Sequence, residues 1–276
     1  MTPVSPLLQP MAFIGGGNMA SALIQGLVKN GTPASAIHVV EPLQTTRDAL
    51  HARHGVHVLP AADASLKNCA LVVWAVKPQV FKEAALLTKD HVANALHLSV
   101  AAGISSDSIA SWLHTKRVVR AMPNTPALVG LGQTGLFATS AVTAEEKHAI
   151  TGMLGLVGES LWVEKEALLD AVTAVSGSGP AYVFYFLEAM VDAGVQMGLS
   201  PAQAHQLAVG TFVGAAELAR SSSDTPAVLR DKVTSKGGTT YAALTVMQAK
   251  GIHDSLIEAM QAARDRAQSL GKELGG

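Results

Sequence analysis

Residues 11–20 read Met-Ala-Phe-Ile-Gly-Gly-Gly-Asn-Met-Ala, and this stretch decides the fold. A short apolar run stops at glycines, and a helical pattern of apolar residues then runs from Asn18 to Asn30. The turn has the spacing G-x-G-x-x-A of dinucleotide-binding loops, in the strand-to-helix context that this fingerprint needs. The alternative is a glycine-rich turn without a ligand. We predict a nucleotide-binding loop made of Gly15, Gly16, Gly17, Asn18, Met19 and Ala20.

The chain that follows alternates between short apolar runs and helical patterns. One run ends at Glu41, whose carboxylate stands where a ribose hydroxyl would be bound. A helix is predicted around Thr45 to His54. The continuous apolar run at residues 70–76 is typical of a parallel strand that is buried on both faces. The pattern predicts a doubly wound, Rossmann-type parallel sheet with further strands at residues 37–40, 56–58, 70–76, 96–100 and 116–120.

The second half of the sequence has a different pattern. Strand-like runs stop near Leu168, and proline- and glycine-containing turns then separate long helical segments. We predict a dinucleotide-binding Rossmann domain over residues 1–165 and an all-helical substrate-binding and dimerisation domain over residues 166–276. The predicted helices cover residues 181–199, 201–220, 226–233 and 240–274.

Composition excludes several classes of protein. The 276 residues carry a net charge of −1, so no basic surface for nucleic acid is expected. The mean hydropathy is +0.29, yet Glu188 and Asp192 interrupt the most apolar helix, which predicts a helix buried in protein rather than in a membrane. A surplus of apolar surface of this kind predicts an oligomer interface.

Cysteine and histidine patterns, and the beginning of the chain, bear on cofactor and compartment. Cys69 is the single cysteine, and the histidines show no metal-ligand spacing, so neither a disulfide nor a bound metal is expected. Residues 1–10 lack the basic and apolar regions of a signal peptide, and we expect a cytoplasmic protein.

Two further loops follow predicted strands, at the sheet edge where ligands bind in open parallel sheets. The first contains Ala75, Val76, Lys77 and Pro78, and the second contains Asn124. Taken singly, each favours a structural interpretation, with Lys77 a solvated cation and Asn124 a turn former. Their shared position above the sheet favours contact with a ligand.

Residues 235–240, Ser-Lys-Gly-Gly-Thr-Thr, run into a helical pattern. Two glycines let the backbone turn with its N–H groups exposed, and the helix behind them contributes the positive end of its dipole. Such a turn binds a small carboxylate or phosphate, although the same residues also suit an ordinary helix N-terminus.

Six motifs together give a resemblance to a known family. Over nearly its whole length the chain resembles pyrroline-5-carboxylate reductase. The motifs Val175–Ala181 and Val233–Thr240 are the most specific, because generic dehydrogenases lack them. The resemblance implies NADPH- or NADH-dependent reduction of 1-pyrroline-5-carboxylate to L-proline, the last step of proline biosynthesis. It also implies a homodimer intertwined through the helical domain, and association of such dimers into a decamer. The motifs are Phe13–Ala20, Ala75–Pro78, Ser99–Gly103, Arg120–Pro126, Val175–Ala181 and Val233–Thr240.

The resemblance also implies roles for individual residues. Thr240 is the catalytic partner of the ring nitrogen, and Thr239 helps to hold the carboxylate. The implied substrate-binding residues are Glu166, Lys232, Ser235, Gly237, Gly238, Thr239 and Thr240. The implied cofactor-binding residues beyond the glycine loop and Glu41 are Ala75, Val76, Lys77, Pro78, Val100, Ala102 and Asn124.

Three residues depart from the family pattern. Lys236 replaces a usual proline, and Ala62 replaces an asparagine that often touches the cofactor. Glu41 stands where relatives that favour NADPH have a small polar residue, and Arg47 lies downstream, so the choice between NADPH and NADH stays open.

Two other interpretations share parts of the pattern. A β-hydroxyacid dehydrogenase would resemble the chain up to about residue 130, but it relies on a lysine acid in its helical domain. A nucleotide sensor without turnover would not need Ser235, Gly237, Gly238 and Thr240, which are all present.

Overall fold

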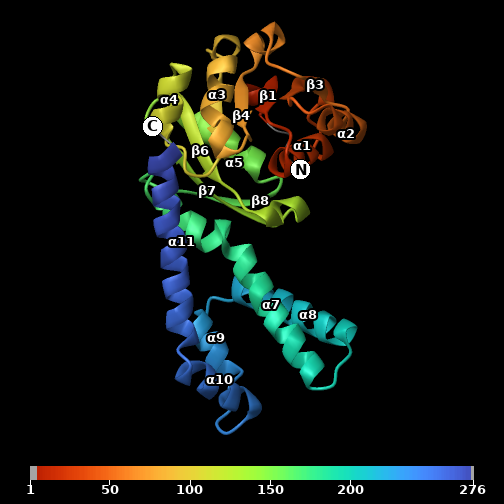
Figure 1. Ribbon diagram of the computed structural model, residues 1–276, viewed down its shortest axis with the longest axis vertical. Coiled ribbons are helices and arrows are strands. Elements are labelled where there is room, and N and C mark those ends of the chain that lie inside the picture. Colours follow the sequence, from red (N-terminus) through yellow and green to blue (C-terminus); the bar gives the residue numbers. More distant parts are fainter. Residues whose placement is uncertain (1–4, 275–276) are drawn as a thin grey trace. The chain divides into compact units, whose positions relative to one another are not determined.

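In residues 5–274, which the computed structural model describes, eight strands form one sheet in the order β3-β2-β1-β4-β5-β6-β7-β8 (Figure 1). β1 pairs with β2 on one side and with β4 on the other, and only the β6–β7 pair is antiparallel. The chain therefore crosses over at β1, which is the switch point of a Rossmann-type sheet. The strands are β1 (Met11–Ile14), β2 (Ile37–Val40), β3 (His57–Leu59), β4 (Leu71–Trp74), β5 (Leu96–Ser99), β6 (Val118–Met122), β7 (Gly132–Ala138) and β8 (Gly158–Trp162).

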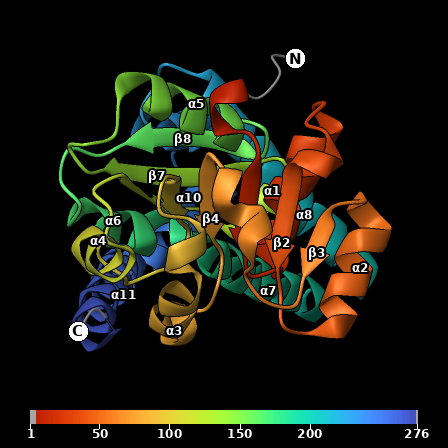
Figure 2. The same cartoon turned by 90° about the horizontal axis from the view of Figure 1, so that it is seen from above.

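Helices cover both faces of this sheet, and Figure 2 shows β3 beside β2 towards one end and β7 beside β8 at the other. α1 (Asn18–Lys29), α2 (Gln44–His54) and α5 (Ala144–Leu154) pack on the face that carries Phe13. α3 (Pro78–Thr88) and α4 (Ser106–Leu113) pack on the face that carries Trp74. All residues of β1, β4 and β5 are buried, because helices cover both of their faces.

The predicted doubly wound sheet is confirmed, with one correction to its direction. Every strand predicted from an apolar run is present: β1 and β2 have the predicted bounds, and the ends of β3, β4, β5 and β6 differ from the prediction by at most two residues. β7 and β8 were not predicted, and β7 makes the sheet mixed rather than wholly parallel. β7 contains two glycines and β8 alternates between exposed and half-buried residues, so neither gives a continuous apolar run.

The remaining segments are helical. α6 (Leu168–Val172) continues into a short π-helix (Thr173–Gly177), and five helices follow. The single helix predicted over residues 240–274 is wrong, because Gly251 has a φ of +64° and separates α10 from α11. The five helices are α7 (Gly179–Gln196), α8 (Pro201–Ser221), α9 (Pro226–Lys232), α10 (Thr239–Ala249) and α11 (Ile252–Leu274).

Two compact units divide the chain. The first comprises residues up to Ser178 together with those from Ala263 onward, and the second comprises Gly179–Ala262. α11 therefore contributes to both units. Its last residues belong to the packing of the first unit, where Leu274 joins the cluster around Trp112. The domain boundary near residue 165 stays a prediction, and it places residues 166–178 differently from this division.

Large apolar side chains on α7 and α8 are exposed on the single chain, which is typical of surface covered in an oligomer. None of the helices within residues 5–274 is both long and apolar enough to span a membrane. The exposed side chains include Phe184, Tyr185 and Met190 on α7 and Leu207, Val213 and Leu218 on α8.

A buried histidine connects β4 and β5 inside the sheet. The indole N–H of Trp74 donates to Nδ1 of His97 at 3.1 Å, and His97 is fully buried. Because Nδ1 accepts this bond, the ring proton lies on Nε2 in the neutral tautomer. Burial, with the positive charge of Arg117 nearby, lowers the pKa of His97 to about 4.

This pKa predicts an acid-sensitive contribution to stability. A histidine in the unfolded chain titrates near 6.5, so between about pH 6.5 and pH 4 the unfolded state binds a proton that the folded state does not. The free energy of unfolding should therefore fall as the pH is lowered through this window, by at most about 3 kcal/mol. Chemical denaturation of the wild type at pH 7 and pH 4.5 measures this loss.

His97→Gln is the matched variant, because its amide oxygen can still accept from Trp74 but does not titrate. His38 and His54, whose pKa values burial also lowers, are present in both proteins and cancel in the comparison. An identical pH dependence in the two proteins would show that His97 does not carry the effect.

Candidate cofactor and substrate sites

The glycine loop brings two strand ends into backbone contact. The N–H of Gly15 donates to the carbonyl of Val40 at 2.9 Å, and Gly15 has a φ of +96°. A β-carbon at Gly15 would lie 2.7 Å from the carbonyl oxygen of Ala75, so only glycine fits. α1 starts directly after Gly17, and no side chain caps its first N–H groups. These groups are therefore available to a phosphate.

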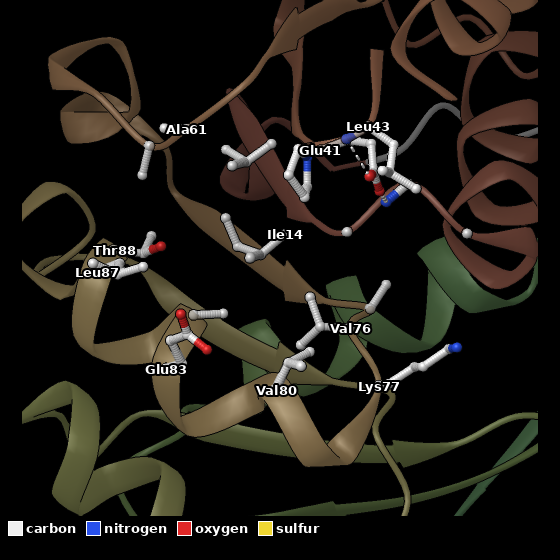
Figure 3. A pocket seen from close by; sticks show the side chains of 18 of the residues that line it. Ile14, Glu41, Leu43, Ala61, Val76, Lys77, Val80, Glu83, Leu87 and Thr88 are labelled. Atoms are coloured by element: carbon white, nitrogen blue, oxygen red, sulfur yellow. Dashed lines mark hydrogen bonds between the residues drawn. The ribbon is translucent and has the colours of Figure 1, made fainter. Parts of the chain in front are cut away.

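A cavity of about 580 Å³ opens beside this loop (Figure 3). Its size lies within the range of about 300–1,000 Å³ that is usual for small-molecule sites. The predicted cofactor residues that line it are Gly15, Gly16, Gly17, Glu41, Ala75, Val76 and Lys77. The lining that was not predicted comes from β1, the ends of β2 and β3, and α3: Ile14, Val40, Pro42, Leu43, Pro60, Ala61, Val80, Glu83, Ala84, Leu87 and Thr88.

Glu41 lies at one side of the cavity with its carboxylate held by backbone groups. One oxygen accepts from the N–H of Gly16 at 3.0 Å, and the other accepts from the N–H of Leu43 at 2.9 Å. The residue is only 9% exposed. The bond to Gly16 places the negative charge next to the glycine loop, which is where the ribose of a bound dinucleotide lies in this fold.

The far end of the cavity is apolar. Val80, Ala84 and Leu87 lie along α3, and Ala61 and Ala62 lie on the loop after β3. In Figure 3, Glu83 and Thr88 lie across the cavity from Glu41, while the side chain of Lys77 points out of the cavity. An apolar slot, a carboxylate and an uncapped helix start fit the base, ribose and phosphates of a dinucleotide.

The turn of residues 235–240 lies in the second unit. The N–H of Gly238 donates to the carbonyl of Ser235 at 3.0 Å, and Gly237 has a φ of +75°. α10 starts at Thr239 without a side-chain cap, and Thr239 and Thr240 are both exposed. The turn therefore presents backbone N–H groups and two hydroxyls at one helix end.

Two family models match the regions of the chain that contain these residues. The pyrroline-5-carboxylate reductase dimerisation model matches residues 166–270, and the model described as NADP oxidoreductase coenzyme F420-dependent matches residues 10–103. A pyrroline-5-carboxylate reductase of Pseudomonas aeruginosa is 42% identical, with 96% of this chain and 98% of that protein covered. The chain belongs to the pyrroline-5-carboxylate reductase family.

Solved structures of this family have the same fold. The pyrroline-5-carboxylate reductase of Coxiella burnetii has a TM-score of 0.88 at 36% identity, and covers 95% of this chain and 98% of its own. The reductase of Plasmodium falciparum with NADP bound has a TM-score of 0.84 at 27% identity, and covers 95% and 97%. Family membership makes the chain an NAD(P)-dependent oxidoreductase.

Several predicted cofactor residues are not among those that line the cavity: Asn18, Met19, Ala20, Pro78, Val100, Ala102 and Asn124. Ala20 is fully buried under the loop. The side chain of Asn124 donates to the carbonyl of Ser176 at 3.0 Å and accepts from the N–H of Gln133 at 2.8 Å, which joins segments within the first unit. Ala62, by contrast, lines the cavity, so the alanine replaces the usual asparagine at a wall of the site.

Two implied substrate residues are engaged in ion pairs. Lys232 pairs with Asp224 at the surface of the second unit. Glu166 accepts from the N–H and the hydroxyl of Ser106, both at 2.6 Å, and from Arg120 at 2.8 Å. Burial opposes ionisation of Glu166, but the bonds from Ser106 and Arg120 outweigh it and hold the pKa of Glu166 below its ordinary value. In the structure, therefore, Glu166 fastens the start of α4 to β6.

We predict that Glu166→Ala destabilises the protein by about 2–3 kcal/mol, because Arg120 then loses its partner in a half-buried position. Urea unfolding of Glu166→Ala, Ser106→Ala and the double variant measures the coupling, which should exceed about 0.5 kcal/mol. Unchanged stability with a raised KM for the substrate alone would assign Glu166 to substrate binding instead.

Proposed function

We propose that the chain reduces the C=N bond of 1-pyrroline-5-carboxylate to give L-proline, with NADH or NADPH as the reductant. The observation that carries the proposal is the Ser235–Thr240 turn, within a region that matches the pyrroline-5-carboxylate reductase dimerisation model. Relatives from Pseudomonas aeruginosa and Pisum sativum, at 42% and 37% identity over nearly the whole chain, are both named pyrroline-5-carboxylate reductase.

The reaction needs a hydride, a proton and a fixed ring. When bound, a reduced dinucleotide would supply the hydride to the imine carbon. The residues proposed to hold the dinucleotide are those that line the cavity. Gly15–Gly17 would lie at the phosphates, Glu41 at the ribose, and Val76 and Lys77 in the loop that follows β4. Ala75 contributes its backbone in the same loop.

The substrate carries one carboxylate and one ring nitrogen. The turn at Gly237 and Gly238 supports an anion site, because its backbone N–H groups and the start of α10 both favour negative charge. Ser235, Thr239 and Lys232 are proposed to complete this site. The hydroxyl of Thr240 is proposed as the hydrogen-bond partner of the ring nitrogen, where charge changes as the hydride arrives.

No strong acid is required for this chemistry. A protonated imine is already electrophilic, so catalysis rests on positioning and on one well-placed hydrogen bond. After hydride transfer, the ring nitrogen keeps its proton and becomes the secondary amine of proline.

The dimerisation region supports homo-oligomerisation, and the exposed apolar side chains of α7 and α8 are the surface that we expect a second copy to cover. We propose a homodimer and its further association into a decamer. The cytoplasm is the proposed compartment, which suits the buried free thiol of Cys69.

The activity is tested by following cofactor oxidation after 1-pyrroline-5-carboxylate is added. Thr240→Ala should lower kcat/KM by about 10- to 100-fold, because one donor or acceptor at the reacting nitrogen is lost. Cofactor affinity should stay at the wild-type value. Thr240→Ser, which keeps the hydroxyl, should retain most of the activity, and wild-type kcat/KM in Thr240→Ala would remove Thr240 from the mechanism.

Gly238→Ala tests the proposed anion site. A β-carbon at Gly238 would lie 2.6 Å from Oγ and 3.1 Å from the carbonyl oxygen of Ser235, so the Ser235 side chain must rotate and its carbonyl must shift within the turn. We expect the KM for 1-pyrroline-5-carboxylate to rise about tenfold or more, while the Kd for the cofactor is unchanged because that cavity lies in the first unit. An equal loss of both affinities, with a changed circular dichroism spectrum, would indicate misfolding instead.

A further inference from the structure

We propose that Glu41 makes this chain select a dinucleotide without a 2′-phosphate, so that NADH is bound in preference to NADPH. The proposal rests on the cofactor site described above and specifies which form of the cofactor that site takes. It concerns only residues of the first unit, all within or beside one cavity.

The first argument is the fixed position of the carboxylate. The N–H groups of Gly16 and Leu43 each occupy one oxygen of Glu41, at 3.0 and 2.9 Å, so the side chain cannot turn away without breaking both bonds. A carboxylate offers about four acceptor positions, and two of them remain. These two suit the hydroxyl donors of an unmodified ribose, whereas a 2′-phosphate brings negative charge and no donor.

The second argument is the engagement of the nearest cation. Nη1 of Arg47 donates to the carbonyls of Glu41 and Pro42, both at 2.7 Å, and Nη2 donates to the side chain of Gln44. Gln44 is in turn tied to Asp48 at 2.6 Å. Arg47 thus braces the loop after β2, and binding a phosphate would require it to give up these carbonyls.

The third argument is the charge of the remaining lining. Leu43, at 63% exposure, stands at the rim next to Glu41 and offers no donor from its side chain. Lys77 is the cation among the lining residues and its side chain points out of the cavity, while Glu83 adds a second carboxylate on α3 (Figure 3). A 2′-phosphate at Glu41 would therefore face a like charge without a free cation beside it.

The fold itself does not impose this selection. The Plasmodium falciparum relative was solved with NADP bound, and its TM-score to this chain is 0.84. The preference must therefore come from side chains at the end of β2, and Glu41 is the charged one that lines the cavity there.

The test is calorimetric titration of the cofactor-free protein with NAD⁺ and with NADP⁺, which needs no substrate. We expect the wild type to bind NAD⁺ at least about tenfold more tightly. Glu41→Gln, which keeps the shape and one acceptor, should lower this preference about tenfold, and Glu41→Ser should do the same if Glu41→Gln folds poorly. Glu145→Gln, which removes one negative charge from the exposed start of α5 outside the cavity lining, should leave the ratio within about twofold of wild type.

Arg47→Met tests whether Arg47, rather than Glu41, determines how the site treats a 2′-phosphate. If Arg47 only braces the loop, both affinities should weaken together and their ratio should stay within about twofold. A selective loss of NADP⁺ affinity would assign phosphate binding to Arg47 and overturn the proposal, as would tighter NADP⁺ binding by the wild type or an unchanged ratio in both Glu41 variants.

Failure of the proposed activity gives a different result. A chain that binds NAD⁺ selectively but does not oxidise NADH with 1-pyrroline-5-carboxylate would contradict the reductase function and leave the role of Glu41 standing. Rapid turnover with NADPH and weak binding of NAD⁺ would do the reverse.

Discussion

The site depends on one close approach of backbone to backbone, between the loop after β1 and the loop after β4. The N–H of Ala75 donates to the carbonyl of Ile14 at 2.8 Å, and the missing β-carbon of Gly15 lets the two loops touch. Because β1 lies between β2 and β4, this contact also brings Gly16 within reach of Glu41. The same few peptide groups therefore position the glycine loop, the carboxylate of Glu41 and the loop that follows β4.

Much of this arrangement could be predicted from short apolar runs and one glycine fingerprint. The presence of the first six strands was predicted because each is a short apolar run followed by a helical pattern or a turn, whereas their order in the sheet comes from the structure. β7 and β8 could not be predicted, since their residues are stabilised as strands by pairing with neighbours distant in sequence. The break at Gly251 was hidden because Lys250 and Gly251 interrupt an otherwise continuous apolar pattern by only two residues.

The predicted cofactor residues that line the cavity are mainly those whose backbone reaches it, and most of the side-chain lining was not predicted. Gly15 to Gly17 and Ala75 to Lys77 reach the cavity because strand ends must meet there. The wall formed by Val80, Ala84 and Leu87 consists of residues that also suit an ordinary amphipathic helix, so nothing in their types marks them. The family resemblance implied that Asn124 binds the cofactor and that Glu166 binds the substrate. In the structure, Asn124 donates to the carbonyl of Ser176 and Glu166 accepts from Ser106, both within the first unit.

The division of α11 between the two units affects how this chain can be rearranged. Residues from Ala263 onward complete the packing of the first unit, although they follow the whole helical unit in the sequence. A single recombination point after Ser178 would therefore exchange the helical unit together with part of the Rossmann core, including Leu274. A chimera that transplants only the helical unit needs two junctions, the second one inside a continuous helix, where the turns on both sides must keep their register.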